Sequence, residues 1–310
     1  MGAAQPRCDS VAMSIAPLQP YAVPLADGRV LALGERTHVM GIVNVTPDSF
    51  AESSSRLDPT AAIEAALCME AQGAELVDIG GESTRHGADS VSAEVELARV
   101  LPVVRGLAGR LGVPISVDTY KAAVARAVLD AGAAIINDVS GLRFDPALGR
   151  VVAERCAALV LMHTRGRSKI MYADAEYGDV IGEIAAELGA SVRAARAAGV
   201  PIDRVIVDPG IGFAKRPVHS YGVLARLATL ASLVGRPLLV GPSRKSFMRE
   251  AVGERPPTDR DWGTAAAVTA AVLAGAHIVR VHAVAEMVQV VRVAEEIRRQ
   301  AEDENGKRQT

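Results

Sequence analysis

The sequence predicts an α/β protein with a single-domain (β/α)8 barrel, the TIM barrel architecture. Eight short apolar runs rich in Val, Ile and Leu recur along the 310 residues, and Ala-rich stretches with helical spacing lie between them. With 49% hydrophobic but only 3% aromatic residues, the interior must consist of Ala, Val, Leu and Ile, which suits parallel strands covered by helices. No shift in composition marks a linker, so we expect one domain.

Each of the eight apolar runs has the length of a buried strand. In chain order they are HVMGIVNV (38–45), ELVDIGGES (75–83), PISVDT (114–119), AIINDVSG (134–141), LVLMHT (159–164), VIVDPGIG (205–212), LLVGPSRKS (238–246) and IVRVHAV (278–284). The stretches 59–74, 121–133 and 263–277 repeat apolar residues every three or four positions and reach a glycine near their ends, as helices do. An open doubly wound sheet is the main rival, but no GxGxxG follows the first strand.

The two ends of the chain do not share this rhythm. Residues 1–28 begin with MGAAQPRCDSVAMSIAPLQP, which is rich in Pro, Ala and Gly without a period, and residues 302–310 are charged and polar. We therefore expect a flexible N-terminal extension over 1–28, the barrel over 29–301 and a polar C-terminal tail over 302–310.

Charge and cysteine content exclude several classes of partner. The net charge of −2, from 34 basic and 36 acidic residues, provides no field that would recruit nucleic acid or an anionic membrane. No apolar run is long enough to span a bilayer, and no secretory signal pattern opens the chain. Cys8, Cys68 and Cys156 lack the spacing of a zinc site or disulfide framework, so a reducing cytoplasm is the expected location.

Most of the predicted strands end in polar residues that a barrel interior would not select. These are Asn44, Glu82, Asp118, Asn137 with Asp138, His163, Asp208, Ser243 to Lys245, and Arg280 with His282. The carboxyl ends of the strands in such a barrel meet at one face, which carries the active site. The sequence therefore predicts an enzyme.

Three short polar groups, Asp118, Asn137 and Asp208, follow β-branched runs and would be carried inward on separate strands. A buried carboxylate needs a partner, and a heterocycle with ring N–H and amino donors provides one. A helix cap or an internal salt bridge explains a lone Asp equally well. Three such groups together favour a ligand.

Basic residues gather at the ends of the last two strands, where many barrels bind phosphate. Arg244, Lys245, Arg280 and His282 would compensate a diphosphate, although a solvated surface or a packed histidine explains either motif alone. Asn44, at the end of the first strand, is placed to meet a ligand or hydrated Mg²⁺.

The segment GGESTRHG (80–87) is interpreted as a second binding loop, because its glycines allow close approach of a ligand. A turn followed by an exposed Arg is the alternative. No GxSxG, HExxH or P-loop is present, and His38, His163 and His219 are interpreted as structural.

Eight ordered motifs resemble those of dihydropteroate synthases. They are MGIVNVTPDSF (40–50), DIGGESTR (78–85), SVDT (116–119), NDVSG (137–141), LMH (161–163), DPGIGFAK (208–215), SRKSF (243–247) and RVH (280–282). The resemblance runs from about residue 38 to about residue 300. Each motif is weak alone, but their common order and spacing are specific.

The resemblance implies condensation of 6-hydroxymethyl-7,8-dihydropterin diphosphate with p-aminobenzoate to 7,8-dihydropteroate and diphosphate in folate biosynthesis, with Mg²⁺ as cofactor. It implies that Asp118, Asn137, Met162, Asp208, Phe213 and Lys245 bind the pterin, and that Thr84, Arg85, Ser243, Arg280 and His282 contact the diphosphate and p-aminobenzoate. The same resemblance assigns catalytic roles to Asn44, Glu52, Lys245, Arg280 and His282, and it also places Asn44 at the metal. A homodimer through outer helices is implied as well.

The implied mechanism is SN1-like: diphosphate leaves first, and the aromatic amine then traps the pterin cation. Loops at 45–57 and 83–90 would close to complete the site.

Several positions depart from the usual pattern of the family. Glu52 stands where the first loop usually carries Asp, His86 replaces a Pro, and Ala283 replaces an acid after RVH. Residues 164–166 read TRG where MQG is usual, and Ser220 replaces an Asn. These changes predict a divergent synthase with altered sensitivity to sulfonamides, which mimic p-aminobenzoate.

Two other functions stay open at this point. A methyltetrahydrofolate-binding methyltransferase-like barrel would share the Asp and Asn clamp, but it needs no diphosphate pocket and no SRKS motif. A paralogue that binds a pterin without synthase activity is kept open by Glu52 and Ala283.

Overall fold

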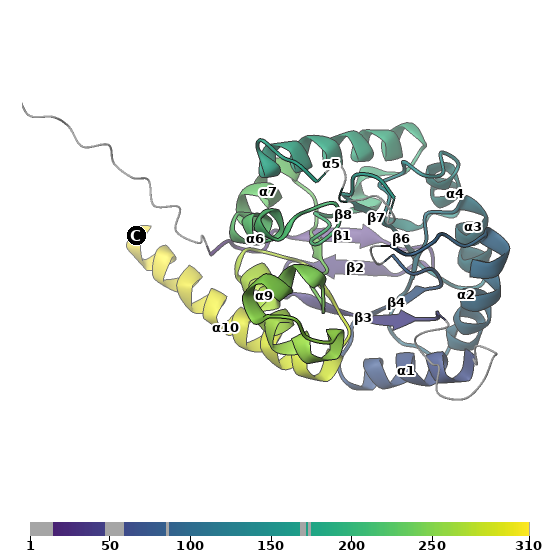
Figure 1. Cartoon of the computed structure of the whole chain (residues 1–310), viewed down its shortest axis with the longest axis horizontal. Helices are drawn as coiled ribbons and strands as arrows, with labels where there is room; N and C mark the ends of the chain where they lie inside the picture. Colours follow the sequence, from purple (N-terminus) through teal and green to yellow (C-terminus); the bar gives the residue numbers. More distant parts are fainter. Residues whose placement is uncertain (1–14, 47–58, 85–86, 168–171, 173–174, 310) are drawn as a thin grey trace, which may run out of the picture.

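Eight parallel strands form a nearly closed barrel in the computed structural model, which describes residues 15–46, 59–84, 87–167, 172 and 175–309 (Figure 1). The strands are β3 (His38–Asn44), β4 (Leu76–Gly80), β5 (Ile115–Asp118), β6 (Ile135–Asp138), β7 (Ala158–Met162), β8 (Val205–Asp208), β9 (Leu239–Val240) and β10 (Ile278–Val281). Their order in the sheet is β8-β7-β6-β5-β4-β3-β10-β9, and a parallel bridge between Val207 and Leu238 joins the two outer strands. The (β/α)8 prediction is confirmed, and each predicted run overlaps one strand.

Helices surround the sheet (Figure 1). They are α1 (Pro59–Ala71), α2 (Ala93–Leu107), α3 (Ala122–Asp130), α4 (Leu148–Glu154), α5 (Val180–Ala197), α6 (Pro217–Ala225), α7 (Leu227–Val234), α8 (Arg249–Val252), α9 (Asp261–Leu273) and α10 (Val284–Gln309), with short 3-10 turns at Ile202–Arg204, Ser246–Met248 and Pro257–Arg260. The predicted helix stops are confirmed, because Gly73, Gly132 and Gly275 lie just beyond α1, α3 and α9 with φ of +100°, +111° and +87°. Within the described residues, no helix is long and apolar enough to cross a membrane.

An antiparallel hairpin, β1 (Tyr21–Pro24) and β2 (Val30–Leu33), was not predicted. Its residues Val23, Leu25, Leu31 and Leu33 belong to one buried cluster with inward-facing strand residues such as Met40 and Ile278. The hairpin therefore closes the N-terminal end of the barrel. Its strands of four residues are too short to give a clear alternation.

The hairpin begins inside the segment that the sequence assigned to a flexible extension over 1–28. The last helix also differs from expectation, because α10 continues to Gln309 through residues expected to form a polar tail. The folded part of the chain is therefore longer at both ends than the composition indicated.

The register of the strands aligns the predicted site residues. Asn44 pairs with Gly80, Gly80 with Asp118, and Asp118 with Asn137, so one row crosses four strands at the C-terminal face. On the other side of the barrel, Met162 pairs with Asp208. Residues from distant motifs thus meet at one level.

Candidate active site

The predicted polar strand ends converge on one cluster in the mouth of the barrel. Asp118, Asn137 and Asp208 are buried there, with 9%, 3% and 5% of their surface exposed. Lys245 and Arg280 are partly buried beside them. The grouping of acids, amide and cations that the sequence indicated is therefore present.

Asp78 lies at the centre of this cluster, and sequence reasoning missed it. Arg280 donates from Nε to Asp78 Oδ2 at 2.6 Å, and Asn137 donates from Nδ2 to the same oxygen at 2.9 Å. Among the described residues, Asp78 Oδ1 is buried with no hydrogen-bond partner. Its position in the middle of the apolar run LVDIG was the available signal, because a carboxylate facing a barrel interior requires a partner.

Arg280 also connects Asp78 to the predicted pterin site. Its second nitrogen, Nη2, donates to Asp118 Oδ2 at 3.1 Å. Burial raises the pKa of Asp118 to about 8, and the neighbouring Asp78 adds to the rise, although Arg280 opposes it. Asp118 therefore takes up a proton more readily than an exposed carboxyl group does.

Asp208 and Lys245 form a second acid and base pair across the mouth. Asp208 Oδ1 accepts from the backbone N–H of Gly210 at 2.7 Å. Burial raises the pKa of Asp208, and burial lowers the pKa of Lys245 to about 8 although Asp208 opposes that change. Lys245 Nζ lies 4.4 Å from the ring centroid of Phe213, in cation–π contact.

The diphosphate side is assembled from β9 and β10. Ser243 Oγ lies 2.9 Å from His282 Nδ1 and also accepts from the backbone N–H of His282 at 3.2 Å. Arg244 does not join them, because its backbone is left-handed, with φ of +58°, and its guanidinium binds both oxygens of Asp261 at 2.7 Å. The structure therefore does not bring Arg244 together with Ser243 and His282.

Other predicted site residues lie apart from this cluster or outside the residues that the structure describes. Thr84 lines a rim cavity of about 140 Å³ with Glu82, Tyr120 and Phe144. Glu52, Arg85 and His86 lie outside the described residues, as does most of the first predicted loop. Of the three histidines interpreted as structural, His163 is buried and bonded on both ring nitrogens.

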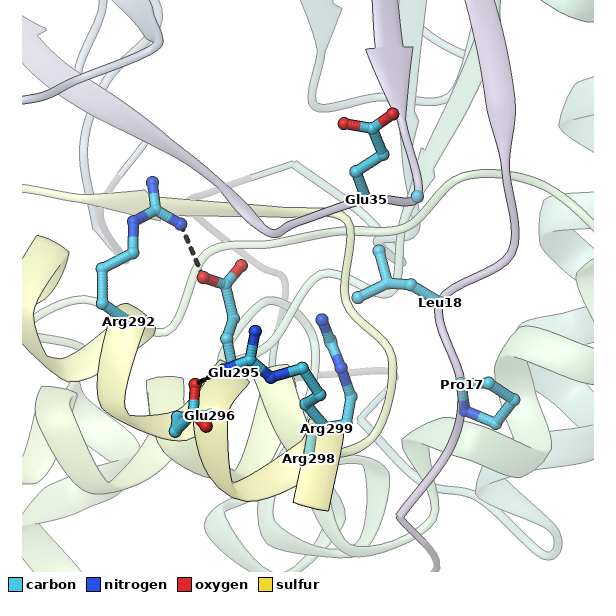
Figure 2. A pocket seen from close by; sticks show the side chains of 9 residues that line it. Pro17, Leu18, Glu35, Arg292, Glu295, Glu296, Arg298 and Arg299 are labelled. Atoms are coloured by element: carbon cyan, nitrogen blue, oxygen red, sulfur yellow. Dashed lines mark hydrogen bonds and ion pairs between the residues drawn. The ribbon is translucent and has the colours of Figure 1, made fainter. Parts of the chain in front are cut away.

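A larger cavity of about 430 Å³ lies at the opposite end of the barrel, between the hairpin segment and α10 (Figure 2). Its charged side chains pair with one another, as in the contact of Arg292 with Glu295 at 2.7 Å and the ion pair of Arg299 with Glu296. No strand carboxyl end reaches it. We therefore place the active site at the C-terminal rim.

In the described part of the chain, no group of three or more His, Cys, Asp or Glu residues could hold a metal by itself. Asn44 and Asp118 nevertheless border the same small space beside Gly80. A Cβ built on Gly80 would lie 3.8 Å from Asn44 Oδ1 and 3.9 Å from Asp118 Oδ2. Two hard oxygens close to one another suit a cation that takes its remaining ligands from water and substrate.

Comparison with known proteins gives concordant matches. The family described as "Pterin binding enzyme" matches residues 40–282. A dihydropteroate synthase of Synechocystis is 45% identical over 88% of this chain and 94% of its own, and that of Mycobacterium leprae is 45% identical over 82% and 91%.

Solved structures agree with these matches. Xanthomonas albilineans dihydropteroate synthase with 4-aminobenzoic acid has a TM-score of 0.82 and 41% identity, over 89% of this chain and 98% of that one. The same enzyme in complex with 7,8-dihydropteroate has a TM-score of 0.79 and 38% identity, over 89% and 98%.

Proposed function

The chain belongs to the dihydropteroate synthase family, and we propose from that premise how its rim divides the work between two substrates. As a dihydropteroate synthase it is a transferase of folate synthesis, which joins 6-hydroxymethyl-7,8-dihydropterin diphosphate to p-aminobenzoate. The observation that carries the assignment of roles is the buried cluster of Asp118, Asn137, Asp208 and Lys245 around Arg280.

We call Asp118, Asn137, Asp208 and Lys245 the pterin clamp. Asp78 determines which atoms of this clamp accept hydrogen bonds from the ligand. Because Asn137 donates its Nδ2 to Asp78, its carbonyl oxygen remains as an acceptor for a ligand. Asp118 and Asp208 add further acceptors, which suit the ring N–H and amino donors of a pterin. Met162 and Phe213 supply the apolar walls.

Arg280 has a double role in this proposal. In this structure its Nη2 donates a hydrogen bond to Asp118, while its Nε donates one to Asp78. Pterin donors that engage Asp118 take the place of Nη2 and leave it available for the diphosphate. Arg280 and His282 thereby bind the leaving group only once the pterin is seated.

The charge of the mouth favours departure of the diphosphate. The carbon–oxygen bond of the pterin methylene breaks, and the diphosphate leaves with the electron pair. The amine of p-aminobenzoate then forms the carbon–nitrogen bond and loses a proton. The acidic groups of Asp78, Asp118 and Asp208 line the mouth beside Lys245 and Arg280, and we propose that they stabilise the intermediate pterin cation.

We propose that Mg²⁺ binds near Gly80, where Asn44 and Asp118 would hold it. When bound, the ion neutralises charge on the diphosphate. Asn44 would orient the hydrated ion, while Arg280 and His282 bind the other side of the leaving group.

On the p-aminobenzoate side, Ser243 lies among the described residues, and Thr84 and Arg85 are proposed to complete the site when the loops close, with Glu52 helping to stabilise the cation. The departures at His86 and Glu52 support altered handling of sulfonamides. Unchanged sulfamethoxazole inhibition relative to an ordinary synthase would contradict this.

Turnover with the pterin diphosphate, p-aminobenzoate and Mg²⁺ tests the function through dihydropteroate and released diphosphate. Asp118→Ala should weaken pterin binding about 100-fold, because a buried charge-assisted acceptor is lost. Glu52→Ala should slow diphosphate release with binding nearly retained. Equal binding loss in both variants would mean that these roles are misassigned.

We also propose a cytoplasmic homodimer that forms through outer helices. Exposed apolar side chains support it, since Val218 on α6 and Leu233 on α7 are 65% and 59% exposed. Light scattering should give twice the 32.3 kDa chain mass, and a Leu233→Asp variant should shift the mass toward that of one chain.

A further inference from the structure

The loop after β8 is held mainly by side chains, with one backbone hydrogen bond from the Phe213 N–H to the Gly210 carbonyl at 3.0 Å. Each of five successive carbonyls, those of residues 210–214, accepts a hydrogen bond from a side chain. The donors are Lys215 to Gly210 (3.1 Å) and Phe213 (3.0 Å), Lys245 to Ile211 (2.5 Å), Tyr172 to Gly212 (3.3 Å) and Tyr177 to Ala214 (2.9 Å). Two lysines and two tyrosines therefore fix the path of this loop.

The backbone of the loop explains why it needs these donors. Gly210, Gly212 and Ala214 are left-handed, with φ of +67°, +78° and +46°. Alternation of left-handed residues turns successive carbonyls in different directions, so a regular ladder cannot pair them. The Gly210 carbonyl also accepts from the Phe213 N–H, but without the side-chain donors the carbonyls of residues 211–214 would be buried and unpaired or exposed to water.

Lys215 is the most deeply buried of the four donors, with 1% of its surface exposed. Besides Gly210 and Phe213, its Nζ contacts His163 Nδ1 at 2.9 Å. Three acceptors around one nitrogen match the three N–H donors of an ammonium group. Burial opposes this charge and lowers the pKa of Lys215, so the charge must be compensated nearby.

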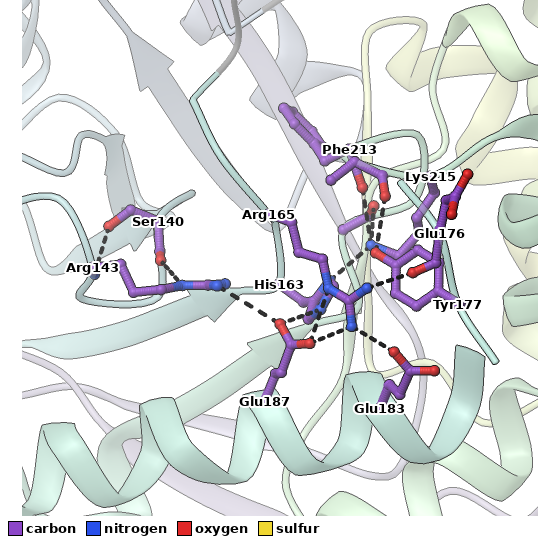
Figure 3. A network of polar contacts seen from close by, with 12 residues as sticks. Ser140, Arg143, His163, Arg165, Glu176, Tyr177, Glu183, Glu187, Phe213 and Lys215 are labelled. Carbon is purple, nitrogen blue, oxygen red and sulfur yellow. Dashed lines mark hydrogen bonds and ion pairs between the residues drawn. The ribbon is translucent and has the colours of Figure 1, made fainter. Parts of the chain in front are cut away.

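His163 links that ammonium to a carboxylate (Figure 3). Burial and the adjacent Lys215 lower the pKa of His163 to about 3, so its imidazole is neutral. With Nδ1 accepting from Lys215, the ring proton lies on Nε2 and is donated to Glu187 Oε2 at 3.1 Å. Glu187 on α5 thus supplies the negative charge through the ring.

Arg165 completes the network from the loop after β7. It donates to Glu187 at 3.0 and 2.5 Å and to Glu183 at 2.7 Å, and its guanidinium lies 4.0 Å from the ring centroid of Tyr177. Tyr177 in turn donates to the Ala214 carbonyl. The network therefore begins and ends on the same loop, with α5 as its support.

We propose that Lys215 and His163 are positioning residues for the pterin, because they fix the loop that carries Phe213 and supplies the carbonyl bonded to Lys245. The inference rests on the pterin contacts of Phe213 and Lys245 proposed above. Neither Lys215 nor His163 needs to touch substrate. They act by fixing the positions of Phe213 and Lys245, which contact the pterin.

The first test is Lys215→Met, which keeps the length of the side chain and removes its three donations. Calorimetric titration with 6-hydroxymethylpterin, which lacks the diphosphate, should give a Kd at least 10-fold above that of the unaltered enzyme, measured below the Tm of each variant. Lys121→Met is the matched control, since Lys121 bonds Glu82 and Glu96 at the same rim without contacting residues 209–214. It should lower Tm and leave Kd within twofold.

A pair of His163 variants provides the second test and decides the matter if Lys215→Met does not fold. Asn places an oxygen near the position of Nδ1 and can still accept from Lys215, whereas Leu cannot. We expect pterin Kd within about 3-fold for His163→Asn and at least 10-fold weaker for His163→Leu. Equal Kd values in these two variants, or an unchanged Kd in folded Lys215→Met, would overturn the proposal.

Asp118→Ala separates this inference from the proposed function. If Asp118→Ala weakens binding of 6-hydroxymethylpterin and Lys215→Met does not, only the positioning role is wrong. If Asp118→Ala has no effect, the pterin clamp itself is misassigned.

Discussion

The two halves of the barrel rim position their binding groups by different means. At β4 to β6 the groups are side chains on the strands themselves, and the register sets Gly80, Asp118 and Asn137 side by side. At β8 only Asp208 lies on the strand, and the other groups lie in or against an irregular loop, whose carbonyls need donors from outside it. The first half therefore depends on charge pairing inside the barrel, and the second half depends on support from α5.

The largest effect that separates the two halves is expected for Asp78→Ala. Removing Asp78 leaves Arg280 partly buried with one carboxylate fewer, which should lower the free energy of unfolding by about 3 kcal/mol. Turnover should also fall, because Asn137 loses the partner that orients its amide. Urea unfolding with parallel assays checks both, and a change below about 1 kcal/mol would show that the first half does not depend on this pair.

In the second half, Gly210→Ala should be the most damaging single-atom addition. A Cβ there would lie 2.0 Å from the His163 carbonyl oxygen, and φ is +67°. Gly28→Ala is the control, because φ is also positive, at +83°, but nothing lies within 4 Å. We expect Gly210→Ala to cost about 2 kcal/mol more than Gly28→Ala in urea unfolding. Equal costs would mean that the loop moves freely away from β7.

The pH dependence of stability should report on Asp118 in the first half. The folded pKa of Asp118 is about 8, above its ordinary value of 3.8, so folding binds a proton there. The stability contributed by protonated Asp118 is full below about pH 4 and is lost as pH rises through about 8. Asp118→Asn should therefore show a shallower fall in unfolding free energy from pH 5 to pH 9. Parallel curves for the two proteins would contradict a proton on Asp118.

The smallest expected effect is that of Arg165→Gln, which restores the residue usual in the family. Its ion pairs with Glu183 and Glu187 are only partly buried, so the loss in unfolding free energy should be about 0.5 to 1 kcal/mol. High salt should reduce the difference between the two proteins. A loss as large as that from Gly210→Ala would instead make Arg165 a main support of the loop.

Much of the fold could be predicted from the sequence, because strands buried on both faces appear as short apolar runs. Residues 115–118 and 205–208, for example, are buried throughout in the structure. The hairpin at 21–33 escaped prediction because its two strands of four residues are defined by what they cover and not by their own pattern.

The candidate site was predicted in the same uneven way. Asp118, Asn137 and Asp208 lie at the ends of their strands, and Lys245 follows β9 at the same face, so their meeting followed from the barrel alone. Asp78 is a single acidic residue among apolar neighbours. Its role becomes visible only through its contact with Arg280, which is 202 positions away in the sequence.

What the sequence by itself determined is the set of strands, their common direction and the chemistry at their ends, because alternation and burial act over a few neighbouring residues. Only the tertiary structure decided which charges compensate one another. Arg244 turned to Asp261 on α9 while Arg280 turned into the mouth, and Lys215 became buried against His163. Such pairings depend on distances across the barrel that no local pattern encodes, since the cost of burying a charge is set by whichever partner the fold brings near.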